Sequence, residues 1–139
     1  MAVLDQLDLV ARDVDKTVAF YRLLGVRIPK SATGAHHVRI DFGGAMELAI
    51  DSRALARAYN AGYRGNKGGG NLVIGFSFRT RRAVDATYKK ITAAGHRGLQ
   101  KPWDAFWGSR YAIVEDPDGN HVGLMSPVDA KKRSPGPAL

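Results

Sequence analysis

The same order of sequence patterns occurs twice along this chain. In each half, a short apolar segment is followed by a helical pattern and then by segments of alternating polarity. The helical patterns place apolar residues at spacings of three and four, which is typical of a helix with one buried stripe. A chain that repeats strand, helix and strands in this order is predicted to form two similar α+β modules.

The first module, residues 4–58, begins with a strand and a helix. Leu7–Ala11 is mostly apolar and is predicted as the strand. Asp13 or Asp15 can cap the helix that follows, because an Asp oxygen accepts a hydrogen bond from a free N–H of the first turn. Gly25 is predicted to end this helix, where a left-handed backbone conformation favours glycine.

A hairpin is predicted next. His36–Phe42 and Ala45–Ile50 are the two strands, and Gly43-Gly44 between them indicates a tight turn. A further short strand or a turn near Arg27-Ile28 is left open. The first module therefore reads as β-α-β-β.

The second module, residues 72–127, repeats this order. Its predicted strands are Leu72–Phe78, Arg110–Val114 and His121–Met125. Thr80 can cap its helix and Gly95 is predicted to close it. Lys101–Gly108, which contains Pro and Gly, is predicted to be irregular. Residues 59–71 are rich in glycine and are predicted as a linker, residues 1–127 as a single domain, and residues 128–139 as a flexible tail.

The bulk composition excludes some classes of protein. The chain has 139 residues, no cysteine and a formal net charge of +8. No apolar run approaches the roughly 20 residues that cross a bilayer, and no signal peptide is recognised at the N-terminus. We therefore expect a cytoplasmic protein that does not contact membranes. The basic residues are scattered, and their densest cluster is Lys131-Lys132-Arg133 in the tail, so this pattern does not predict nucleic-acid binding.

Two motifs resemble those of the vicinal-oxygen-chelate superfamily, which includes glyoxalases, bleomycin-resistance proteins and extradiol dioxygenases. The first is Asp13-x-x-x-Thr17-x-x-Phe20-Tyr21-x-x-Leu24-Gly25, and the second is Glu115-Asp116-Pro117-Asp118-Gly119-Asn120. The resemblance covers about residues 4 to 127. It implies two βαβββ modules that form a curved mixed sheet around a central cleft.

In metal-dependent members of this superfamily, four cleft positions supply the ligands. The resemblance maps these positions to Gln6, Glu47, Val73 and Gly123. Two of the four have no donor atom, and an amide with one carboxylate is a poor site for a hard divalent ion. We therefore predict no metal and no cofactor. The alternative is a divalent metal held by Gln6, Glu47 and His121.

The resemblance, the alternation along the strands and the dense aromatic segment 103–107 together predict residues that bind a ligand. The predicted set is Gln6, Asp8, Arg39, Glu47, Trp103, Phe106, Trp107, Arg110 and Tyr111. The aromatic members are expected to stack on a planar ligand, although plugging an interface is the alternative for them. For Glu47 two roles remain open: a general base in the cleft, or an ordinary strand residue paired with an arginine.

The predicted function is metal-independent binding of a small molecule, such as the drug sequestration that gives antibiotic resistance. The alternative is an enzyme, either a divalent-metal lyase, isomerase or dioxygenase with an altered ligand set, or a metal-free enzyme that uses Glu47 as its base. A homodimer is also expected, because the sheets of such modules leave edges that pairing between copies would cover.

Overall fold

The computed structural model describes residues 1, 4, 6–44, 46–61, 63–65 and 72–138. The chain forms two compact units, Met1–Lys67 and Gly68–Leu139, and each is described by itself. The predicted linker 59–71 falls in part on residues 62 and 66–71, which lie outside the described residues. The predicted single domain of residues 1–127 stays a prediction.

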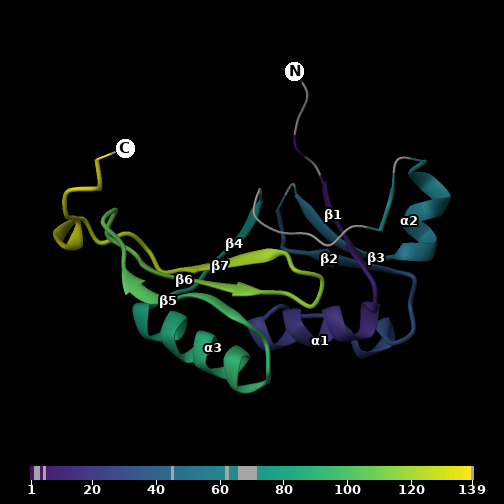
Figure 1. The fold of residues 1–139 in the computed structure, drawn as a ribbon, viewed down its shortest axis with the longest axis horizontal. Coiled ribbons are helices and arrows are strands. Elements are labelled where there is room, and N and C mark those ends of the chain that lie inside the picture. Colours follow the sequence, from purple (N-terminus) through teal and green to yellow (C-terminus); the bar gives the residue numbers. More distant parts are fainter. Residues whose placement is uncertain (2–3, 5, 45, 62, 66–71, 139) are drawn as a thin grey trace. The chain divides into compact units, whose positions relative to one another are not determined.

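The first unit is a three-stranded mixed sheet with a helix packed on one face (Figure 1). Its elements are β1 (Gln6–Ala11), α1 (Val14–Leu24), η1 (Lys30–Ala32), β2 (His37–Asp41), β3 (Glu47–Ser52) and α2 (Arg53–Tyr59). The strand order is β1-β3-β2, with β3 parallel to β1 and antiparallel to β2. The predicted strands of this module are present, with ends shifted by one or two residues.

Helix α1 begins and ends where its sequence predicts. The Asp13 side chain accepts a hydrogen bond from the Lys16 backbone N–H at 3.1 Å, and Gly25 has a φ of 108°. Between these caps the helix buries one stripe against the sheet. Its buried residues are Val14, Thr17, Val18, Phe20, Tyr21 and Leu24.

Two features of the first unit differ from the sequence interpretation. Helix α2 follows β3 directly and is capped by Ser52, whose Oγ accepts a hydrogen bond from the Leu55 N–H at 3.1 Å. This helix was not predicted. The segment at Arg27-Ile28 has no regular secondary structure, and Arg22 Nε donates to the Ile28 carbonyl there at 3.1 Å.

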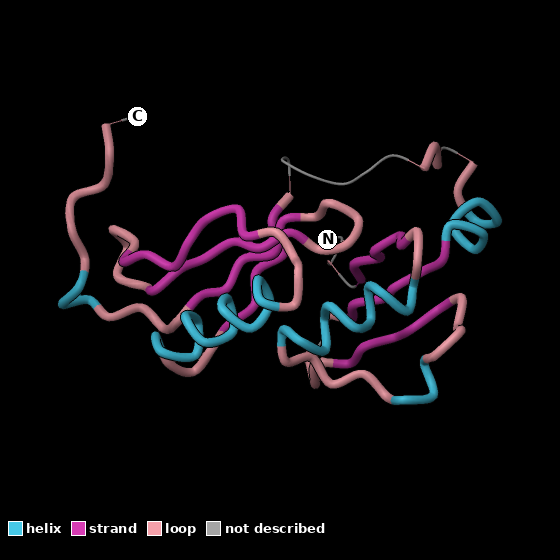
Figure 2. Tube along the Cα trace, turned by 60° about the horizontal axis from the view of Figure 1, so that its bottom comes forward, coloured by secondary structure: helices cyan, strands magenta, loops and turns pink. Residues whose placement is uncertain are grey.

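The second unit is a four-stranded mixed sheet, also with a helix on one face (Figure 2). Its elements are β4 (Val73–Ser77), α3 (Arg81–Ala93), β5 (Gly98–Asp104), β6 (Arg110–Glu115), β7 (His121–Met125) and η2 (Ala130–Lys132). The strand order is β4-β7-β6-β5, with only the β4–β7 pair parallel. The core residues between α3 and the sheet are Val84, Ile91, Ala112, Val114, Val122 and Leu124.

Strand β5 corrects one prediction. Lys101–Asp104 belongs to this strand, whereas Lys101–Gly108 was predicted to be irregular throughout. The register with β6 shifts twice, between Gly98 and Gln100 and between Gln100 and Trp103. Such bulges break the period-two alternation by which a strand is recognised, and Pro102 is tolerated because β5 is an outer strand.

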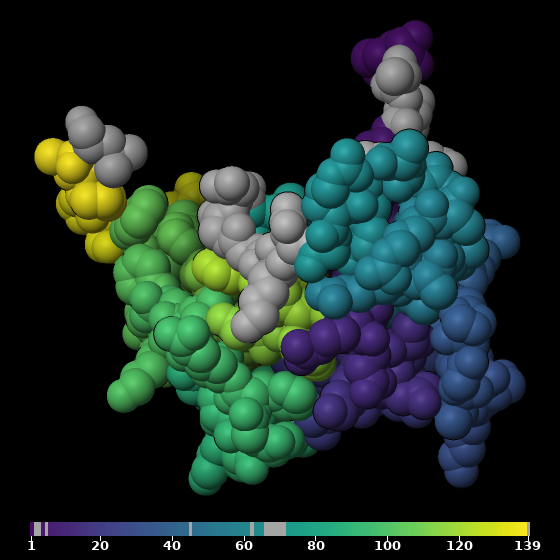
Figure 3. All heavy atoms as spheres, turned by 45° about the vertical axis from the view of Figure 1, so that its right-hand side comes forward, coloured from purple at the N-terminus to yellow at the C-terminus, as the bar shows by residue number. Residues whose placement is uncertain are grey.

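The C-terminal segment lies on the loop that joins β5 to β6 (Figure 3). The Asp129 N–H donates to the Gly108 carbonyl and the Ser134 N–H to the Phe106 carbonyl, each at 3.0 Å. The sequence did not indicate this attachment, although the flexibility of residues 128–139 stays a prediction. Among the described residues, none of the helices combines the length and the apolar character needed to cross a membrane.

Candidate functional site

The face of the second sheet that points away from α3 carries most of the predicted aromatic residues. Along β6, Ala112 and Val114 are fully buried against α3, so Tyr111 and Ile113 point to the opposite face. Trp103 on β5 is the cross-strand partner of Tyr111 and therefore shares that face. This face is the one on which a ligand can reach the aromatic rings.

Four aromatic side chains form a continuous cluster here, which we call the aromatic platform: Trp103, Phe106, Trp107 and Tyr111. Trp107 is its centre, with ring centroids 5.8 Å from Trp103, 5.1 Å from Phe106 and 5.2 Å from Tyr111. These contacts are edge-to-face. Trp103 and Phe106 each keep 36% of their surface exposed, so the cluster is packed internally and still open to solvent.

A tight turn holds the platform in place. The Gly108 N–H donates to the Ala105 carbonyl, and the Ala105 N–H donates to the Ser109 carbonyl, both at 2.9 Å. Gly108 has a φ of 102°, a conformation that side chains disfavour. The turn therefore depends on glycine at this position, and it fixes the backbone of Phe106 and Trp107.

Tyr111 reaches across to β7 and covers Gly123. A Cβ atom built on Gly123 would lie 3.0 Å from the Tyr111 hydroxyl, 3.2 Å from its Cε2 and 3.2 Å from Val73 Cγ1. These distances are tighter than ordinary van der Waals contacts. The space that a larger residue at position 123 would need is thus already filled by Tyr111 and Val73.

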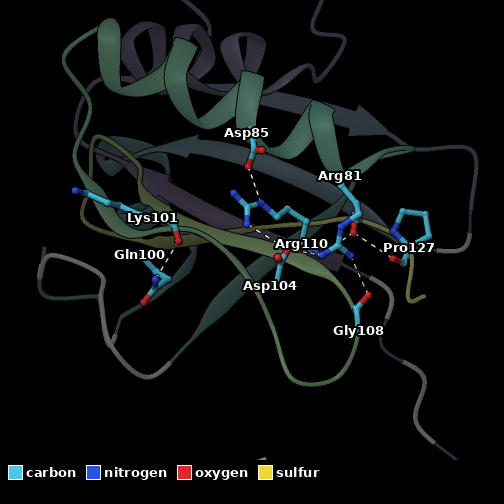
Figure 4. Close-up of polar contacts among 9 residues, drawn as sticks. Arg81, Asp85, Gln100, Lys101, Asp104, Gly108, Arg110 and Pro127 are labelled. Carbon is cyan, nitrogen blue, oxygen red and sulfur yellow. Dashed lines mark hydrogen bonds and ion pairs between the residues drawn. The ribbon is translucent and has the colours of Figure 1, made fainter. Parts of the chain in front are cut away.

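Arg110 does not join the platform, because adjacent strand residues point to opposite faces. Its Nε donates to Asp85 of α3 at 2.8 Å and its Nη1 to Asp104 at 3.2 Å (Figure 4). Arg81 also donates to Asp104. The hydrogen bond from Arg81, followed by that from Arg110, lowers the pKa of Asp104 below its ordinary value. Arg110 is therefore engaged by two carboxylates on the helix side.

The other predicted ligand-binding residues lie together on the first sheet, on the face away from α1. Gln6 and Glu47 are register partners on β1 and β3, and Gln6 Nε2 donates to Asp8 at 2.5 Å. Arg39 forms an ion pair with Glu47, and this hydrogen bond raises the pKa of the Arg39 guanidinium. Glu47 is thus paired with an arginine, as expected for the second of its two predicted roles, an ordinary strand residue.

A third polar cluster on this face was missed by the sequence analysis. Asp51 is 2% exposed, with His37 Nδ1 at 2.6 Å from one carboxylate oxygen and the Tyr59 hydroxyl donating to the other at 2.8 Å. Burial, and then the hydrogen bond to Asp51, raises the pKa of Tyr59 to about 12. Tyr59 belongs to the unforeseen helix α2, so its contact with Asp51 had no sequence signal.

The four positions that the resemblance maps as metal ligands do not supply enough donor atoms for a divalent metal ion. Gln6 is bonded to Asp8 and Glu47 is paired with Arg39, while Val73 and Gly123 offer no donor atom. Tyr111 occupies the space above Gly123. Within the described part of the chain, no group of three or more His, Asp or Glu residues is arranged to hold an ion. The alternative set of Gln6, Glu47 and His121 spans both units and stays a prediction.

Apart from Arg110, the predicted ligand-binding residues thus fall into two groups. Gln6, Asp8, Arg39 and Glu47 lie on the first sheet, and the aromatic platform lies on the second. His121 shares the face of Gly123 on β7, two residues away. The two groups belong to different units, so the central cleft that would join them stays a prediction.

Solved structures and sequences of other proteins are similar to this chain. A glyoxalase/bleomycin resistance protein/dioxygenase family enzyme from Burkholderia phytofirmans is 20% identical, with a TM-score of 0.75, over 90% of this chain and 98% of that one. A glyoxalase-related enzyme from Fulvimarina pelagi is 16% identical, with a TM-score of 0.75, over 91% and 89% of the two chains. At these identities the likeness shows a shared fold.

The similarity to a curated sequence covers a shorter stretch of this chain. An uncharacterized protein of Mycobacterium bovis is 40% identical over 45 residues, which are 32% of this chain and 30% of that relative. The sequence model of the Glyoxalase/Bleomycin resistance protein/Dioxygenase superfamily, by contrast, matches residues 3–124. The fold class predicted from the sequence, α+β with two βαβββ-like modules forming mixed sheets, is confirmed. The chain belongs to the glyoxalase/bleomycin resistance protein/dioxygenase superfamily.

Proposed function

We propose that this protein binds a planar, aromatic small molecule on the aromatic platform, without a divalent metal ion. The observation that carries the proposal is the cluster itself: Trp103 and Phe106 remain 36% exposed although each packs against Trp107. Aromatic rings that only filled the hydrophobic core would be buried. Sequestration of a drug is one role that such binding serves.

The physical basis of binding is stacking on rings that are already ordered. Trp107 makes edge-to-face contacts with three neighbouring rings, so little side-chain freedom is left to lose when a ligand stacks. Aromatic pairs add about 0.5–1.5 kcal/mol beyond the burial of apolar area.

Tryptophan emission is a direct test, because the chain has two tryptophans and both belong to the platform. We expect 2-naphthamide to change this emission in a saturable way. Trp107→Ala should weaken binding about fivefold to tenfold, measured by calorimetry, because it removes the central ring. Phe42→Ala is the matched control, since Phe42 is an exposed aromatic residue of the other unit.

Equal affinity of the wild-type protein and Trp107→Ala for 2-naphthamide would refute stacking. The enzyme alternative has its own test, a melting scan with Mn²⁺, Ni²⁺ and Zn²⁺. A stabilisation by one of these ions that Glu47→Gln abolishes would favour the metal set with Gln6 and His121 over this proposal. The homodimer and the cytoplasmic location stay expectations.

A further inference from the structure

The C-terminal segment brings positive charge to the aromatic platform. Its residues 129 and 134 are bonded to the carbonyls of Gly108 and Phe106, each at 3.0 Å, so the intervening residues lie beside the platform loop. Those residues include Lys131, Lys132 and Arg133, the densest basic cluster of the chain. The short helix η2 sets this spacing, with the Asp129 carboxylate accepting from the Lys131 N–H at 3.0 Å.

Arg133 is a cation that contacts the backbone of Trp107, the central residue of the platform. Its Nε donates to the Trp107 carbonyl at 3.3 Å, and its Cγ would lie 3.1 Å from a Cβ built on Gly108. Arg133 itself is exposed. A guanidinium has five N–H donors, and this contact uses only one of them. Within the described part of the chain, Arg133 forms no ion pair with a carboxylate.

The carboxylates near the platform already have hydrogen-bond or ion-pair partners. Asp104, next to Trp103 on β5, is paired with Arg81 and Arg110. Asp129 accepts from the backbone of η2. Lys101, at the other side of Trp103, is exposed and adds another positive charge. The three cations of residues 131–133 outnumber the Asp129 carboxylate, so this rim of the platform carries a net positive charge.

We propose that the platform selects planar aromatic anions: the ring stacks on Trp107, and the carboxylate or sulfonate is bound by the guanidinium of Arg133. This inference rests on the proposed function and adds the charge class of the ligand. Arg133 suits this role because a planar guanidinium donates two parallel hydrogen bonds to a carboxylate. Lys131 and Lys132 contribute to attraction over a longer range.

The test compares three probes with one ring system and different charges: 2-naphthoate, 2-naphthamide and 2-naphthylmethylamine. Calorimetry on the full chain should show that the anion binds about fivefold to tenfold more tightly than the amide, and that the amine binds most weakly. Arg133→Ala should abolish the preference for the anion and leave the affinity for 2-naphthamide within about twofold. Arg133→Lys should retain only part of the preference, because an ammonium group is a point charge.

Lys90→Ala is the matched control. Lys90 is an exposed residue near the end of α3, and its loss changes the net charge by the same amount. The preference for the anion should persist in this variant, which separates a local contact from the overall charge of +8. Equal loss of the preference in Lys90→Ala would overturn the inference.

The outcomes also separate this inference from the proposed function. Tight binding of 2-naphthamide without preference for 2-naphthoate would overturn the inference and leave stacking intact. Weaker binding of all three probes to Arg133→Ala by one common factor would show that Arg133 only supports the loop, which also overturns it. No binding of any probe to the wild-type protein would refute both.

Discussion

Replacing Gly108 by alanine should destabilise the second unit through two separate effects. Gly108 has a φ of 102°, and a left-handed backbone costs a residue with a Cβ about 1–2 kcal/mol. In addition, the new Cβ would lie 2.5 Å from the Asp129 carbonyl oxygen and 3.1 Å from Arg133 Cγ. An overpacked contact of this kind costs about 1–3 kcal/mol.

The free energy that the clash can cost has an upper limit, because the C-terminal segment can detach from the loop. Three hydrogen bonds hold the segment to the loop, from Asp129, Arg133 and Ser134. Each contributes about 0.5–1.5 kcal/mol, so the segment is released if the clash costs more than their sum. We therefore expect Gly108→Ala to lower the free energy of unfolding by about 2–5 kcal/mol in total.

Gly95→Ala is the control for the backbone effect. Gly95 belongs to the same unit and has a φ of 95°, but a Cβ there would meet nothing within 4 Å. Its replacement should cost only about 1–2 kcal/mol. Urea unfolding followed by tryptophan emission measures both variants, because both tryptophans lie in the second unit.

The difference between the two variants, about 1–3 kcal/mol, is the contribution of the contact with the C-terminal segment. Trypsin should also cleave Gly108→Ala faster than the wild-type protein after Lys131 and Lys132. Equal free energies of unfolding for Gly108→Ala and Gly95→Ala, with unchanged cleavage, would refute the packing of this segment on the loop.

Two further predictions concern buried polar contacts and the space above Gly123. Tyr59→Phe should cost about 1–3 kcal/mol, because one oxygen of buried Asp51 loses its donor. The raised pKa of Tyr59 contributes stability that is complete below about pH 10 and is lost as the pH rises through about 12. Unfolding followed by circular dichroism should show that Tyr59→Phe loses this pH dependence, and an unchanged slope would contradict the Asp51 contact. Gly123→Ala should cost about 1–3 kcal/mol, but less in a Tyr111→Phe background, where the hydroxyl at 3.0 Å is absent. Additive costs in this double-mutant cycle would show that Tyr111 does not fill that space.

The sequence predicted those parts of the fold that depend on local patterns. The cap at Asp13, the glycine at position 25 and the strand His121–Met125 follow from short-range rules and are present. Strand β5 was missed because its two register shifts remove the alternation. Helix α2 was missed because its seven residues, RALARAY, carry no clear apolar stripe.

The candidate site was predictable to a similar extent. Trp103, Phe106 and Trp107 are close in sequence, so their clustering could be expected. Arg110 was grouped with Tyr111 because the two are adjacent, although adjacent strand residues face opposite ways. The pairing of Asp51 with His37 and Tyr59 depends on contacts between separate elements, which no local pattern indicates.

The irregular register of β5 limits how this protein can add strands from other chains. An outer strand normally presents a row of free N–H and C=O groups that an extended segment can copy. Here two bulges interrupt that row, and Pro102 removes one donor. Extended peptides or misfolded copies are therefore poorly able to pair with the β5 edge of the second sheet. A partner that binds at this edge has to contact side chains rather than the backbone.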